Sequence, residues 1–454
     1  MIGIWAEQAL TSNGWERDVC VTIGADGVIA EVRANAERDG KRITGTLLPA
    51  PVNAHSHAFQ RAMAGLTEAR GPNPGDSFWT WRELMFRFLD RLTPEHVEAI
   101  TALVQMEMLE AGYATSVEFH YLHHQPGGAP YENIAEMSER IVAAALQSGI
   151  GLTLLPVHYQ YGGLDRRALG DGQIRFGNDP DRFARLYEAA SQAIGHLPVD
   201  CRMGLAPHSL RAVDPAGILE TTALTDGPIH MHLAEQVAEV EEVSASLGKR
   251  PVEWVLDSLD PGPGFTFIHC TQMQPHETEG LAKTGSVAGL CPFTESSLGD
   301  GIFDGVRWLD AGGRISIGSD SNIRIALSEE LRTLEYSQRL RDRSRAALAT
   351  TNRSTGRRIF QAMTEGGAHS AGRNTGAIAP GKLADLVALD GAHMDLAGRS
   401  GDATLDSFIF AGDDRMVRDV WSAGRHVVSE GRHVNRSLIE KAYRLVVEEL
   451  MQTQ

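Results

Sequence analysis

An apolar run that ends in His-x-His constrains this chain more than any other feature. Residues 47–52 are apolar and lead into Asn53-Ala54-His55-Ser56-His57. In a β-strand, residues i and i+2 point to the same side, so His55 and His57 are directed at one point and Ser56 points away. Two converging imidazoles suit a divalent metal such as zinc. The competing interpretation is a chance pair of histidines at a sheet edge.

The length and charge of the chain limit the class of protein. Its 454 residues fit one large α/β barrel with a smaller domain. The net charge of -17 argues against nucleic acid and against an anionic membrane as partners. There is no uninterrupted apolar stretch of about 18 residues, and the start lacks the pattern of a signal peptide. The 4 cysteines have no Cys-x-x-Cys spacing, so we expect a reduced, cytoplasmic protein.

Both ends of the chain have the pattern of β-structure. Gly24-Ala25-Asp26-Gly27 and Ser422-Ala423-Gly424-Arg425 each stand between two short apolar runs, which predicts a hairpin at each end. Neither end is large enough to fold alone, so we expect them to join in one small composite β-sandwich domain. A final helix is predicted at residues 438–451. The expected strands are residues 19–23, 28–32, 383–389, 417–421 and 426–429.

Between these ends, eight apolar strand candidates alternate with helical segments. Thr93-Pro94, Asp179-Pro180 and Asp214-Pro215 each combine a capping residue with proline at the first helical position. Eight strands alternating with helices predict an α/β fold of the (β/α)₈ TIM-barrel type. The candidates end near His57, Tyr121, Val157, His208, Leu233, Cys270, Cys291 and Asp320. The expected division is 1–47 for the first part of the β-domain, 48–371 for the barrel and 372–454 for the second part with the terminal helix.

Polar residues stand at the ends of four of these strands, where the active sites of such barrels lie. They are His55 and His57 on the first strand, His232 and Glu235 on the fifth, His269 on the sixth and Asp320 on the eighth. Taken singly, His269 could be a buried structural histidine and Asp320 could cap the next helix. Their joint position favours a metal centre.

This arrangement resembles the amidohydrolase superfamily, the metal-dependent hydrolases with a barrel and a composite β-domain. Pro380-Gly381-Lys382-Leu383-Ala384-Asp385-Leu386-Val387 resembles the segment that re-enters the small domain in that superfamily. The resemblance implies four metal ligands, which are His55, His57, His232 and Asp320. Binuclear members bridge their metals with a carboxylated lysine on the fourth strand, but residues 203–208 contain no lysine. We therefore expect one divalent metal per chain, with zinc favoured and iron or manganese left open.

The same resemblance implies a mechanism. The metal would lower the pKa of its water and supply hydroxide, and Asp320 would take part in accepting that proton. Glu235 resembles the glutamate of the deaminase branch, which passes a proton from water to the departing nitrogen. His269 would hydrogen-bond the attacking water or the developing charge. A solvated carboxylate that opens a helix is the alternative for Glu235. Within this resemblance, the pair of Glu235 and His269 predicts hydrolysis of a C=N bond with release of ammonia.

Residues 53–65, 78–82, 118–121 and 206–211 carry a sharper resemblance. It extends over the whole chain and is to the formimidoylglutamate deiminase family, which hydrolyses N-formimino-L-glutamate to N-formyl-L-glutamate and ammonia in histidine degradation. Two carboxylates on that substrate call for arginine, and Arg82 and Arg211 are the expected clamps. Gln60, Tyr121 and His208 are further expected contacts.

Two other functions remain open. One is an aminohydrolase of the same branch that acts on a nucleobase or a triazine-like cyclic amidine, and it would need an aromatic or amide clamp. The other is a barrel that only binds, which the complete set of ligands disfavours. By analogy we expect a homodimer. The roles of several further polar residues are left open, and we expect no second metal site among them. These residues are His120, His123, His124, His158, His230, Ser321 and Asn322.

Overall fold

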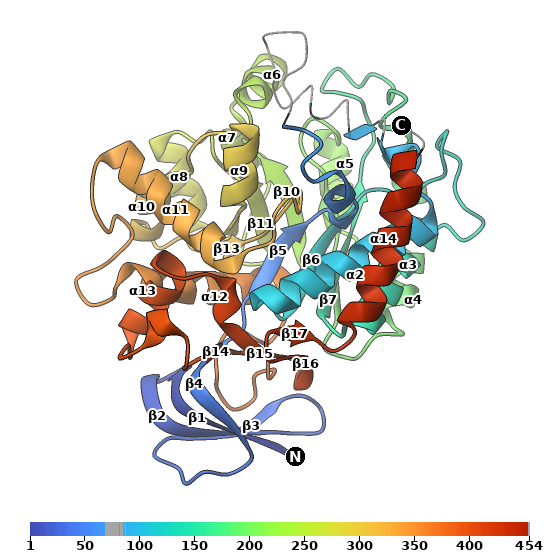
Figure 1. Cartoon of the computed structure of the whole chain (residues 1–454). Coiled ribbons are helices and arrows are strands. Elements are labelled where there is room, and N and C mark those ends of the chain that lie inside the picture. The colour runs from blue at the N-terminus through green and yellow to red at the C-terminus, as the bar shows by residue number, and fades with distance from the viewer. Residues whose placement is uncertain (69–80, 82–84, 87, 453–454) are drawn as a thin grey trace.

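The computed structural model describes residues 1–68, 81, 85–86 and 88–452. A barrel of parallel strands is surrounded by helices, and a smaller mixed sheet lies beneath it in Figure 1. The N-terminus belongs to the small sheet, whereas the C-terminal helix runs up the side of the barrel.

Eight strand positions form the barrel, and every paired neighbour is parallel. The fourth position is split into two short strands that both pair with the third, and a bridge between Leu205 and Ile229 closes the ring. The predicted barrel is therefore confirmed, with strand ends within about three residues of those expected. The barrel strands are β5 (Val52–Ser56), β6 (Thr115–His120), β7 (Gly151–His158), β8 (Arg202–Met203), β9 (Ala206–Pro207), β10 (Ile229–Leu233), β11 (Phe265–His269), β12 (Val287–Leu290) and β13 (Arg314–Ile317).

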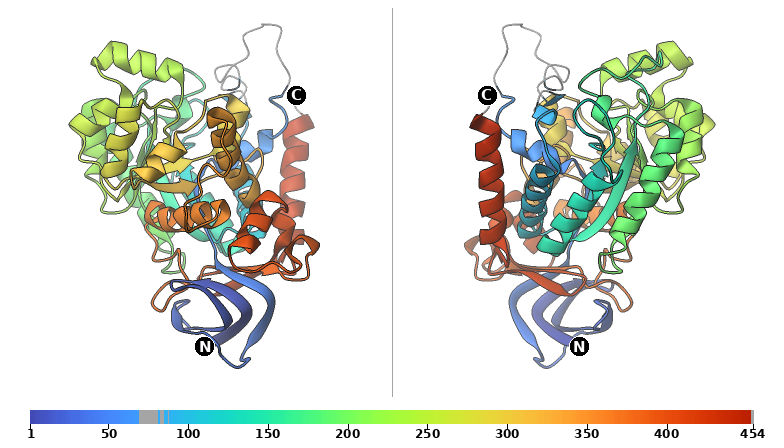
Figure 2. Two further views of the ribbon diagram at one scale, coloured as in Figure 1. Left: turned by 90° about the vertical axis from the view of Figure 1, so that its left-hand side faces the viewer. Right: turned by 90° about the vertical axis from the view of Figure 1, so that its right-hand side faces the viewer.

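Helices cover the outside of the barrel, as the side views of Figure 2 show. The three predicted start signals each begin a helix, because the side chains of Thr93, Asp179 and Asp214 accept a backbone N–H of the first turn. In the described part of the chain, no helix is long and apolar enough to span a bilayer. The helices are α2 (Pro94–Ala111), α3 (Glu136–Ser148), α4 (Pro180–Ile194), α5 (Pro215–Thr222), α6 (Val237–Leu247), α7 (Pro251–Ser258), α8 (Pro275–Lys283), α9 (Pro292–Leu298), α10 (Gly305–Asp310), α11 (Leu327–Asp342), α12 (Thr355–Ala371), α13 (Asp402–Phe410) and α14 (Arg436–Gln452).

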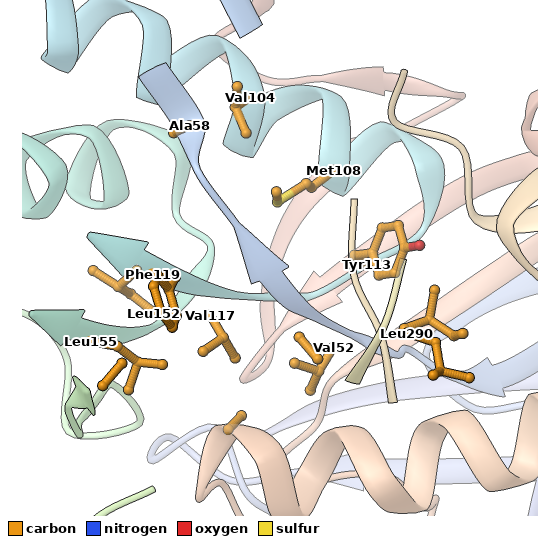
Figure 3. Close-up of a cluster of buried hydrophobic side chains, with 14 of the residues drawn as sticks. Val52, Ala58, Val104, Met108, Tyr113, Val117, Phe119, Leu152, Leu155 and Leu290 are labelled. Carbon is orange, nitrogen blue, oxygen red and sulfur yellow. The ribbon is translucent and has the colours of Figure 1, made fainter. Parts of the chain in front are cut away.

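One large hydrophobic core joins the barrel strands to the helices around them. The strands contribute Val52 and Leu155 to this core, and α2 contributes Val104 and Met108 (Figure 3). Phe119 reaches from this core to the upper end of the barrel, where its ring centroid lies 4.6 Å from that of His232. The side chains at the strand ends thus rest on a close-packed floor.

The small domain is one mixed sheet built from both ends of the chain, as predicted. β4 pairs in parallel with β1 and antiparallel with β14, so it joins the two ends. A bridge between Val28 and Leu383 brings the outer part of the sheet back toward β14, and the sheet curls around its own apolar core. Its strands are β1 (Ile2–Thr11), β2 (Gly14–Ile23), β3 (Ile29–Arg33), β4 (Lys41–Pro49), β14 (Leu386–Asp390), β15 (Val417–Ser422), β16 (Arg425–Ser429) and β17 (Arg432–His433).

Candidate active site

Four predicted metal ligands converge at the upper ends of β5, β10 and β13. His57 Nε2 lies 3.2 Å from Asp320 Oδ1, and His55 Nε2 lies 3.5 Å from the same oxygen. The ring centroids of His55 and His232 are 4.9 Å apart. Residues from strands far apart in the sequence therefore share one small volume.

The orientation of the three histidines fits a metal at their centre. His57 Nδ1 lies 3.0 Å from the carbonyl of Phe119, and His232 Nδ1 lies 3.2 Å from the carbonyl of His208. Each Nδ1–H can donate to its carbonyl, which leaves the Nε2 lone pair for a metal. Both ring nitrogens of His55 are buried without a hydrogen-bond partner among the described residues. A bound cation would satisfy such an atom.

Burial also sets the protonation states that metal binding requires. It lowers the pKa of His55 to about 3 and lowers the pKa of His57 and of His232. Burial alone would raise the pKa of Asp320, but contact with His55 and the nearby His57 lowers it below its usual value. Neutral imidazoles beside an ionised carboxylate are the forms that bind a divalent metal.

A chain of acid and base groups lies next to this cluster. Glu235 Oε1 is 3.7 Å from His269 Nε2, which is 3.8 Å from Asp320 Oδ2. On its other side, His269 Nδ1 lies 3.3 Å from Glu295 Oε1. Burial would lower the pKa of His269, but Glu235, Glu295 and Asp320 raise it to about 10. Burial raises the pKa of Glu235. A carboxyl group with a raised pKa suits proton transfer near neutral pH.

The backbone at these strand ends is bent out of extended conformation. Ala234, His269, Cys270 and Asp320 have φ values of 52°, 72°, 53° and 47°. For residues with a Cβ atom, this left-handed region costs on the order of 1–3 kcal/mol each. Strained residues therefore gather where the side chains of the site are aimed.

A cavity opens over this cluster. Gln60 Nε2 donates to the hydroxyl of Tyr121 at 2.7 Å, and Arg211 Nη2 lies 3.7 Å from Glu235 Oε2. Arg82 lies outside the described residues. The predicted site residues that line the cavity are His57, Gln60, Tyr121, His208, Arg211, His232, Glu235, His269 and Asp320.

The sequence did not single out several side chains that shape this site. Glu295 and Asp300 are buried beside the acid and base groups, and their place depends on the fold of the loops around α9. The remaining lining residues are Trp81, Met85, Phe86, Tyr159, Phe176, Leu298 and Ser321. They come from loops and helix ends, where no periodic pattern marks a side chain as pointing inward. The sequence gave a signal for two of them, the aromatic run around Trp81 and Ser321 next to Asp320.

The other conspicuous polar residues lie elsewhere. His123 Nε2 contacts the carbonyl of Val157 at 3.0 Å, and His230 Nε2 contacts the carbonyl of Ser370 at 2.8 Å, deep in the barrel. Asn322 donates to Ser56 Oγ at 3.1 Å and so braces the back of β5. The described residues that line the cavity do not include His120, His123, His124 or His158.

Comparison with known proteins agrees with this geometry. Residues 46–427 match the model of the amidohydrolase family, and residues 1–41 match that of the "Formimidoylglutamate deiminase HutF, N-terminal domain". A formimidoylglutamate deiminase of Pseudomonas aeruginosa is 46% identical, over 99% of this chain and 100% of its own length. A 5-methylthioadenosine/S-adenosylhomocysteine deaminase of Natronomonas pharaonis is 31% identical, over 77% of this chain and 74% of its own length.

Solved structures give the same assignment. An amidohydrolase from Brucella melitensis has a TM-score of 0.95 and 45% identity, covering 99% of this chain and 100% of its own. An adenosine deaminase from Xanthomonas campestris, solved with bound zinc, has a TM-score of 0.82 and 21% identity, covering 99% and 98%, and it shares the fold. The chain belongs to the amidohydrolase family, as a member that carries the formimidoylglutamate deiminase N-terminal domain.

Proposed function

We propose that this protein hydrolyses the C=N bond of N-formimino-L-glutamate, giving N-formyl-L-glutamate and ammonia. The observation that carries the proposal is the contact chain of Glu235, His269 and Asp320 beside converging histidines, at 3.7 and 3.8 Å. The 46% identity to the Pseudomonas aeruginosa enzyme supports the choice of substrate.

One divalent metal, with zinc favoured, would be held by three histidine nitrogens and one aspartate oxygen. This donor set suits four-coordinate zinc with a position left for water. Bound there, the metal supplies Lewis-acid activation of a water molecule. The fourth barrel position contains no lysine in residues 203–208 to bridge a second metal. The ligands would be His55, His57, His232 and Asp320.

The residues of the chain would carry the protons. Glu235 accepts a proton from the attacking water and delivers it to the formimino nitrogen. The water oxygen bonds to the formimino carbon, the bond from that carbon to the imino nitrogen breaks, and both water protons leave with ammonia. His269, backed by Glu295, donates from Nε2 toward the charge that develops. The raised pKa of Glu235 allows the carboxyl to hold and release this proton.

Substrate recognition would rest on cations in the cavity wall. Arg211 lies partly exposed in that wall and would pair with one carboxylate of the glutamyl group. Arg82, outside the described residues, would be the second clamp. Gln60, Tyr121 and His208 would contact the polar atoms between the two ends of the substrate.

A cyclic amidine such as a nucleobase or triazine is the second candidate substrate. The observation that favours it is the aromatic lining of the cavity by Trp81, Tyr159 and Phe176, which would suit a flat ring. Adenosine-type deaminases among the relatives point the same way.

A substrate panel separates the two candidates. Purified, zinc-loaded protein is given N-formimino-L-glutamate, adenosine and a triazine, and ammonia is measured. We expect turnover of the first alone, and R211M should raise KM for it while R415M, at an exposed arginine, should not. Turnover of the ring compounds with N-formimino-L-glutamate untouched would overturn the proposal.

A further inference from the structure

We propose that Glu239 is a positioning residue, which aims Glu235 by holding the strained end of β10. The inference rests on the proposed role of Glu235 as the proton carrier. Glu239 lies in the first turn of α6, four residues after Glu235, and is only 1% exposed. A carboxylate so deeply buried needs partners, and its partners are the backbone of the loop that carries Glu235.

Both oxygens of Glu239 are used by consecutive backbone groups. Oε1 accepts the N–H of Ala234 at 3.2 Å, and Oε2 accepts the N–H of Glu235 at 2.9 Å. From the other side, Thr271 Oγ1 donates to the carbonyl of Glu235 at 2.7 Å, and the N–H of Gln272 donates to the carbonyl of Ala234 at 2.9 Å. All four backbone polar groups of these two residues are therefore held, two of them by one side chain.

The backbone at this point would relax without such a hold. Ala234 has a φ of 52°, a left-handed conformation that its Cβ disfavours. A return of Ala234 toward extended backbone would rotate the following residue and move the Glu235 carboxylate away from His269 Nε2, now 3.7 Å distant. Because proton transfer depends steeply on geometry, a small rotation would slow the chemical step.

A role through Arg211 is the competing explanation. Burial alone would lower the pKa of Arg211, but neighbouring carboxylates, with Glu239 the largest contributor, raise it above its usual value. If Glu239 served mainly to hold this arginine, its loss would weaken substrate binding and raise KM. If it positions Glu235, its loss would lower kcat and leave KM almost unchanged.

The test is a double-mutant cycle on the full-length, zinc-loaded protein. In E239Q, the amide keeps one acceptor oxygen but sets an NH₂ group against the second backbone N–H. We expect kcat to fall by about 10- to 100-fold, with KM, metal content and Tm close to wild type. In an E235Q background, E239Q should change the residual kcat by less than about twofold, because the residue it serves is gone. E241Q, the same change on an exposed glutamate of α6, should behave as wild type.

Several outcomes would overturn this assignment. An equal loss of kcat in both backgrounds would show a general structural role, and a rise in KM with kcat intact would place the effect at Arg211. If E239Q fails to bind metal or to fold, T271V is the second variant, because it loosens Ala234 and Glu235 from the opposite side. A loss of kcat in T271V that persists in the E235Q background would refute the proposal. Full activity of the single variant E235Q would refute the proposed role of Glu235 as proton carrier, and this result would not depend on any substitution at Glu239.

Discussion

A buried arginine joins the barrel to the small sheet, and its removal should destabilise the whole protein. Arg373, two residues after the end of α12, is fully surrounded by protein. Its Nη1 lies 2.9 Å from Asp200 Oδ2 beside the barrel strand β8, and its Nη2 lies 3.1 Å from Asp385 Oδ2 beside β14. R373A would leave both carboxylates buried with fewer partners.

The size of the loss follows from those partners. Breaking a buried ion pair by removing one member costs about 3–5 kcal/mol. Asp200 keeps two contacts with Arg425, at 2.7 and 2.9 Å, so we expect the lower part of this range, about 3 kcal/mol. With an unfolding entropy of about 2.1 cal/mol/K per residue, a chain of this length loses about 1 °C of Tm per kcal/mol. The expected fall in Tm is therefore about 3 °C.

Thermal unfolding followed by circular dichroism at several pH values measures this loss. Burial opposes the ionisation of Asp200, but Arg425 and Arg373 lower its pKa below 3.8. A carboxyl group whose pKa is lower in the folded state stabilises the fold fully at pH values above its unfolded-state pKa. That stabilisation is lost as the pH falls through its folded-state pKa. The difference in Tm between wild type and R373A should be largest at neutral pH and should shrink below about pH 4. R415A, at an exposed pair with Asp413, is the control. An R373A protein no less stable than R415A would refute the reasoning.

Three further predictions concern the site and its supports. H232A should lose most of its bound zinc by elemental analysis, whereas H230A, whose ring lies deeper in the barrel, should keep it; equal metal content in both would contradict the ligand assignment. Glu295 Oε1 accepts from the backbone N–H of Cys291 and faces His269. E295A should therefore lower kcat about 100-fold, and E295Q, which keeps an acceptor, about 10-fold. Equal losses in the two variants would argue against a role of Glu295 in orienting His269. Burial raises the pKa of Glu118 from 4.5 to about 8, so its stabilising contribution is full below pH 4.5 and lost as the pH rises through 8. E118Q cannot ionise, so its Tm should rise relative to that of wild type as the pH rises from 4.5 to about 8, and a difference that stays constant over this range would refute this.

The barrel was predictable because its local signals agree with its tertiary structure. Proline at the first position of α2, α4 and α5 marked helix starts, and apolar runs marked the strands. α2 shows the limit of pattern reading, since its Val104 faces the barrel while its Leu103 packs near Ile439 of α14. A helix covered on two sides has no clear polar stripe. The sequence also gave no assignment to α13, whose place depends on contacts with α11 and α12.

The site was predictable where the strand rule applies and hidden where it does not. His55 and His57 follow from a period of two and from the position of active sites in parallel barrels. Glu239 and Glu295 come from helices, and their contacts with strand ends depend on how each loop folds back. Sequence spacing alone carries no sign of those contacts.

The most direct test of the account is ammonia release from N-formimino-L-glutamate by the purified protein, with metal content read on the same sample. We expect rapid release with about one divalent metal per chain, loss of activity on chelation and recovery when zinc is returned. A protein that holds its metal, is folded and leaves this substrate untouched would contradict the central claim.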